Sequence, residues 1–177
     1  MCIRDRLAAA SERLAADEPA KVTVLLRETL GFSEAEKLPP YASWVHGLVK
    51  CAIGIGDIEL ARQFVETAQA AAAVVPAPQH AIVTARARVC HAGGDCDSAV
   101  QLFTDAAERW AAFGNRVEQA HALLELGGSL QAEGRDAEEP LRQARELFAS
   151  MGAASGVRRC DELLGESHGT EHNSRAG

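Results

Sequence analysis

Large aromatic side chains are scarce in this sequence. Phe, Trp and Tyr together make up 5% of its 177 residues, whereas 47% of the residues are hydrophobic, and alanine is the commonest of these. A core built from many small side chains requires the backbones to approach closely, which favours helices packed on helices. The sequence therefore predicts an all-α protein.

Long apolar runs and an excess of positive charge are also missing. The longest stretch of small apolar residues, Ala70 to Val75, is too short to cross a bilayer. The formal net charge is -7, whereas affinity for nucleic acids comes largely from clustered Lys and Arg. We therefore expect no direct nucleic-acid partner and no membrane partner.

The cysteines do not suggest a disulfide framework. There are five, an odd number, placed singly at Cys2, Cys51, Cys90, Cys96 and Cys160. The chain also opens without the apolar region of a secretory signal peptide. This pattern is typical of a reducing compartment, so we expect the protein to be cytoplasmic.

Both ends of the chain differ from its middle. The opening MCIRDR, residues 1–6, resembles the translation of a sequencing adapter, so we expect it to be a non-native start on a piece of a longer chain. The alternative is a short, genuine polar terminus. Residues 166–177 are polar and have no apolar period, which predicts a disordered tail.

An internal repeat occupies the middle of the chain. At an offset of 38 residues, five pairs of positions are identical: Gly56 and Gly94, Asp57 and Asp95, Ala61 and Ala99, Gln63 and Gln101, and Ala68 and Ala106. In each copy, Gly permits the left-handed residue that ends one helix, and Asp caps the next helix. Gly114 with Asn115, and Gly134 with Asp136, predict two further turns of this kind.

These signals divide the chain into helical units. We expect a partial leading unit over 7–40, repeats over 41–75, 76–114 and 115–153, and a closing helix over 154–165. Because one helix pair cannot bury its apolar face alone, the pairs should stack as a short α-solenoid. The residues expected to pack between helices are Ala61, Ala68, Ala99, Phe103, Ala106, Leu126, Gly127, Leu141 and Phe148.

No motif in the sequence predicts catalysis. The phosphate-binding pattern G-x-x-x-x-G-K-[ST] is missing, and we expect no catalytic residue, cofactor or metal. One alternative is a metal-binding or enzymatic helical protein that uses Cys90, His91 and Cys96. Zinc sites usually have four ligands, however, and no fourth ligand is evident. The simpler interpretation packs Cys90 in the core, exposes His91 and leaves Cys96 in a turn.

The helix pairs resemble tetratricopeptide (TPR) repeats. The resemblance depends on Leu126-Gly127 in an inner helix and on Ala99, Phe103 and Ala106 in an outer helix, although the units are longer than the family's roughly 34 residues. The stretch from Ala106 to Ala153 looks like the C-terminal repeats of large bacterial signalling proteins that carry an AAA-type ATPase. Some of these proteins are linked to adenylate or guanylate cyclases, and others are LuxR-type transcriptional regulators.

The resemblance implies a regulatory scaffold without catalytic activity. Its partner would be a protein or peptide, or upstream domains of its own parent chain. The exposed residues of the inner helices would form the binding face, and the sequence suggests these candidates: His46, Lys50, Arg86, Arg88, His91, His121 and Glu125.

Overall fold

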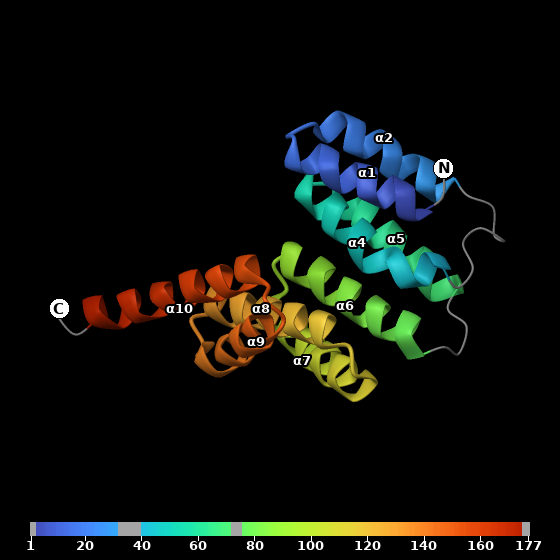
Figure 1. Cartoon of the computed structure of the whole chain (residues 1–177). Helices are drawn as coiled ribbons and strands as arrows, with labels where there is room; N and C mark the ends of the chain where they lie inside the picture. Colours follow the sequence, from blue (N-terminus) through green and yellow to red (C-terminus); the bar gives the residue numbers. More distant parts are fainter. Residues whose placement is uncertain (1–2, 32–39, 72–75, 175–177) are drawn as a thin grey trace. The chain divides into compact units, whose positions relative to one another are not determined.

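The computed structural model describes residues 3–31, 40–71 and 76–174, and these residues form helices without any strand (Figure 1). The helices are α1 (Ile3–Ala15), α2 (Pro19–Leu30), α4 (Pro40–Gly54), α5 (Ile58–Ala71), α6 (Pro76–Ala92), α7 (Cys96–Phe113), α8 (Arg116–Ala132), α9 (Glu138–Ser150) and α10 (Ala154–Ser174). The predicted all-α fold class is confirmed.

The chain divides into two compact units, Met1–Asp95 (unit 1) and Cys96–Gly177 (unit 2). Unit 1 contains α1, α2, α4, α5 and α6, and unit 2 contains α7 to α10. The division falls inside the second expected repeat, 76–114, between its two helices. The repeat boundaries inferred from the sequence remain a prediction.

Unit 1 is a serial stack of helices. α1 packs against α2 and α4, and α4 packs against α5 and α6 (Figure 1). Two glycines of α4 allow α1 to come close, because a Cβ at Gly47 or at Gly54 would lie 2.7 Å from a methyl carbon of Leu7 or of Leu14. The first two helices, α1 and α2, form a complete helix pair. The first helix of this pair begins at the buried Ile3, inside residues 1–6, which the sequence predicts to be a non-native start.

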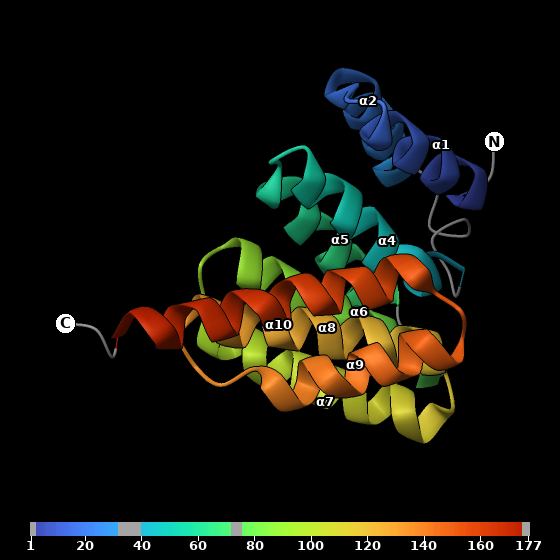
Figure 2. The same cartoon turned by 60° about the vertical axis from the view of Figure 1, so that its left-hand side comes forward.

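Unit 2 is also a stack in which successive helices pack on one another. α7 packs on α8, α8 on α9, and α9 on α10 (Figure 2). The last helix extends to Ser174, whereas the sequence predicted a helix over 154–165 followed by a disordered tail. The prediction relied on the polar composition of residues 166–177, on their lack of an apolar period and on their two glycines. A glycine inside a helix costs only about 1 kcal/mol relative to alanine, however, and this segment has no proline.

Glycines with positive φ end the helices at the predicted turns. Gly56, Gly94, Gly114, Gly134 and also Gly152 have φ between +66° and +82°. At the first of these turns, the Gly56 amide donates to the Ile53 carbonyl and the Asp57 amide to the Ala52 carbonyl, at 2.9 and 3.0 Å. These two bonds form a Schellman motif, which satisfies carbonyls that the helix end leaves unpaired.

The predicted capping side chains are also in place at two turns. The Asp57 carboxylate accepts a hydrogen bond from the Leu60 amide at 2.9 Å, and the Asn115 side chain accepts one from the Glu118 amide at 3.2 Å. At the third turn the N-cap of α9 is Ala137 instead of the predicted Asp136, although the Asp136 carboxylate still accepts from the Glu138 amide at 2.9 Å. At the α1–α2 turn, the residue with positive φ is Asp17, at +56°, instead of a glycine. The glycine pattern of the sequence therefore does not predict this turn.

Replacing Gly56 with alanine should destabilise unit 1. A side chain in the left-handed region costs about 1–2 kcal/mol, and nothing near Gly56 would offset it by new packing. Urea unfolding followed by circular dichroism measures the difference. The control is Gln63→Ala at an exposed position of α5, which we expect to stay within about 0.5 kcal/mol of the wild type. Equal stability of the two variants would contradict this account of the turn.

Candidate functional site

The inner helices of unit 1 carry positive charge without negative charge. Neither α4 nor α6 contains Asp or Glu, although the whole chain has a net charge of -7. Of the candidate residues on these helices, Lys50, Arg86 and His91 are exposed, and His46 is half-buried. These four side chains are therefore at least partly accessible to solvent.

The prediction that Arg88 is exposed is wrong. Arg88 is 9% exposed, and its guanidinium Nη1 donates a hydrogen bond to the backbone carbonyl of His46 at 2.8 Å. Arg88 therefore holds α6 against α4. Arg86 lies only two residues away, which is about 200° around the helix axis, so the two arginines point in opposite directions. The predicted face is not a single surface.

The candidate residues His121 and Glu125 lie in α8, which belongs to unit 2. The other candidates lie in α4 and α6 of unit 1. His121 and Glu125 are both half-buried. The His121 ring meets the Phe148 ring edge to face, with 5.1 Å between their centroids. This geometry makes His121 part of the packing between α8 and α9, in addition to its partial exposure.

The residues predicted to pack between helices are all buried. In unit 1 these are Ala61 and Ala68 of α5. In unit 2, Leu141 lies directly against the α carbon of Gly127, where any larger side chain would collide with it. The others in unit 2 are Ala99, Phe103, Ala106, Leu126 and Phe148.

The geometry does not support the metal alternative. Among the residues that the structure describes, no group of three or more His, Cys, Asp or Glu side chains could hold a metal ion. His91 is exposed, whereas Cys90 and Cys96 are half-buried. Burial raises the pKa of the Cys90 thiol, and Asp95 raises it further, against the opposing effect of Arg86 and Arg62. The described structure therefore does not bring Cys90, His91 and Cys96 together as ligands of one ion.

The raised pKa of Cys90 predicts slow alkylation. At pH 8.5 the folded protein should hold a smaller fraction of Cys90 as thiolate than the unfolded chain, so iodoacetamide should modify it several-fold more slowly without urea than with urea. The rate in the folded protein should rise as the pH approaches the raised pKa. Peptide mapping by mass spectrometry measures this residue alone. Faster modification in the folded state would show that the thiolate is stabilised instead.

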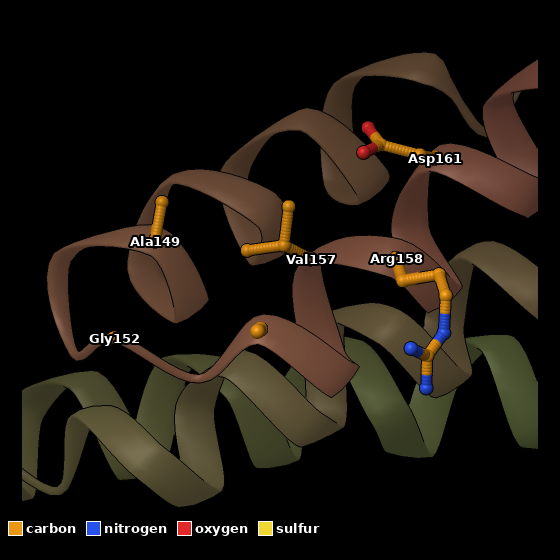
Figure 3. A pocket seen from close by; sticks show the side chains of 6 residues that line it. Ala149, Gly152, Val157, Arg158 and Asp161 are labelled. Atoms are coloured by element: carbon orange, nitrogen blue, oxygen red, sulfur yellow. The ribbon is translucent and has the colours of Figure 1, made fainter.

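A shallow hollow lies where α9 turns into α10, at residues that no pattern in the sequence singles out. It has a volume of about 390 Å³, and Figure 3 shows side chains of both helices around it. Its lining residues are Ala149, Gly152, Ala154, Val157, Arg158 and Asp161. All of them lie in one short stretch of sequence, yet only the reversal of the chain at Gly152 brings the two helices together.

Among the residues whose side chains are described, three large apolar ones are notably exposed: Val24 in α2, Phe113 at the end of α7 and Val117 at the start of α8. Phe113 also contacts the buried Trp110, with ring centroids 6.1 Å apart. In the described part of the chain, no helix is both long enough and apolar enough to cross a membrane.

Comparison with known proteins identifies the fold. No family model matches the sequence, and no curated protein matches it. Among solved structures, the TPR-like repeats of a candidate kinesin light chain from Podosopora anserina superpose with a TM-score of 0.57 at 18% identity. The match covers 99% of this chain and 97% of that chain, and a single-substitution variant of the same protein gives the same values. The chain therefore has the fold of TPR-like helical repeats.

Proposed function

We propose that this chain is a protein-interaction scaffold without catalytic activity of its own. Its partner is a protein or peptide, or other domains of a longer parent chain. The observation that carries the proposal is the serial packing of helix pairs, with α4 placed between α1 and α6. Such stacking produces extended surfaces on which proteins bind, and the described residues offer no metal-binding group in its place.

The contact residues that we propose in unit 1 are His46, Lys50, Arg86 and His91. The composition of α4 and α6 supports this choice, because Lys50 and Arg86 give these helices positive charge and neither helix contains Asp or Glu. Arg88 contributes indirectly, since its bond to the His46 carbonyl fixes the spacing of the two helices. In unit 2, the proposed contact residues are His121 and Glu125.

Selection of peptides displayed on phage tests the scaffold proposal. We expect the purified full chain to enrich peptides that bind the wild type and lose most of their affinity for the Lys50→Glu variant. The control is Lys21→Glu on α2, which makes the same substitution at an exposed position outside α4 and α6 and should leave binding unchanged. Failure to enrich any peptide, or equal binding to both variants, would count against the proposed face.

We further propose that the parent protein is a multidomain ATP-binding signalling protein, with this chain as its C-terminal repeat region in the cytoplasm. The resemblance of Ala106 to Ala153 to cyclase-linked AAA-type ATPases supports this, and a LuxR-type transcriptional regulator is the alternative. Recovering the reading frame that contains this sequence tests the proposal. A G-x-x-x-x-G-K-[ST] motif upstream supports an ATP-binding parent, and its absence from the complete frame rejects one.

A further inference from the structure

The hollow at the α9–α10 turn occupies a position that recurs in unit 2. Gly114, between α7 and α8, and Gly152, between α9 and α10, both have positive φ and lie 38 residues apart. Both turns lead from an outer helix into the next inner helix. Positions of α10 can therefore be compared with positions of α8 at this offset, which pairs Arg158 with Ala120 and Asp161 with Leu123.

The two helices differ on this face. In α8, Ala120 is 0% and Leu123 is 7% exposed, on a helix that is covered by both α7 and α9. In α10 the matching residues Arg158 and Asp161 are exposed and line the hollow, as Figure 3 shows. The two positions that are buried in α8 are thus exposed in α10. They are occupied by the polar Arg158 and Asp161 in α10, where α8 has the apolar Ala120 and Leu123.

The side chains around the hollow favour one kind of occupant. Ala149, Ala154 and Val157 form an apolar floor. The Asp161 carboxylate is neutralised by Arg145 of α9, at 2.6 Å between Oδ1 and Nε.

One positive charge next to the hollow is left in excess. Among the side chains that the structure describes, Arg158 and Arg159 share a single carboxylate, that of Glu162, at 4.0 and 3.0 Å. The Arg158 side chain is 74% exposed, so it can turn toward a ligand. The hollow therefore combines an apolar surface with a surplus cation.

We infer that this hollow binds a helical segment of a partner protein that presents a bulky apolar side chain and a carboxylate one helical turn apart. The apolar side chain packs on Val157 and Ala154, and the carboxylate pairs with Arg158. Residues three or four apart lie on the same side of a helix, so one segment can offer both groups. The inference rests on the proposed scaffold function, and it adds a site in unit 2 to the inner-helix residues proposed in unit 1.

Nuclear magnetic resonance titration of the full chain tests the inference. The probe is a synthetic alanine-rich peptide of roughly 15 residues, a length at which isolated helices begin to form, with one Leu and one Glu four residues apart. A second peptide has Lys in place of Glu. With the Glu peptide, we expect the backbone amides of Gly152, Ala154 and Val157 to shift. The Lys peptide should bind roughly fivefold more weakly, in keeping with the energy of one exposed ion pair.

A charge exchange provides the matched control. The Arg158→Glu variant should prefer the Lys peptide to the Glu peptide, whereas Arg62→Glu, at an exposed position of α5 in unit 1, should keep the wild-type preference. The inference is overturned if the two peptides bind equally, if neither binds, or if the shifts fall outside the α9–α10 turn. None of these results removes the scaffold proposal, because the peptides selected on phage test the Lys50 face independently.

Discussion

Replacing Gly127 with alanine should lower the free energy of unfolding of unit 2 by about 1–3 kcal/mol, the usual cost of forcing an extra methyl group into a packed core. The added methyl would collide with the side chain of Leu141, which is itself fully buried. This steric cost exceeds the gain of about 1 kcal/mol that alanine normally brings to a helix interior. The close approach of α8 and α9 therefore depends on this one position.

The neighbouring glycine supplies the control. Gly128 also lies inside α8, but nothing lies within 4 Å of the place where its Cβ would be. Gly128→Ala should therefore stabilise the protein by about 0.5–1 kcal/mol. Urea unfolding followed by Trp110 fluorescence, in a Trp44→Phe background, measures both variants in unit 2. If both substitutions shift stability in the same direction, the proposed packing of Leu141 against Gly127 is wrong.

Truncating Phe148 to alanine should cost more, about 3–5 kcal/mol, because it removes a large buried ring and leaves a cavity. Phe148 is 2% exposed and joins three helices, since its ring contacts His121 of α8 and lies against the α carbon of Gly156 in α10. We expect the loss to appear also as faster amide hydrogen exchange in the first turns of α10, where the ring no longer supports the helix.

Phe113→Ala is the matched control for this prediction. The Phe113 side chain is 51% exposed, so the same chemical truncation removes little buried surface, and we expect a change of at most about 1 kcal/mol. A loss of stability as large as that of Phe148→Ala would mean that Phe113 is buried in solution. Such a result would indicate an interface at the end of α7.

Much of the local structure could be predicted from the sequence because its causes are local. A glycine at the end of an apolar period is free to adopt a positive φ, and a following Asp or Asn caps the next helix. These rules placed the turns at Gly56, Gly94, Gly114 and Gly134. They failed at Asp17, where a residue other than glycine takes the left-handed conformation, and so the first helix pair was only partly anticipated.

The candidate site was less predictable, since it depends on which neighbour covers each side of a helix. Arg86 and Arg88 look alike in the sequence, but one is exposed and the other is covered by α4 and bonded to its backbone. The hollow at the α9–α10 turn escaped prediction for a similar reason. Its residues read as an ordinary helix end and helix start, and only their packing leaves a gap between them.

By itself, the sequence determined the all-α class, the turn positions and the small residues at the helix contacts, because hydrophobic period and backbone freedom act over a few residues. Only the tertiary structure decided which charged side chains face solvent and where an open, partly apolar surface remains. These properties depend on contacts between helices that are distant along the chain, and burial is a property of the assembled fold rather than of any one segment.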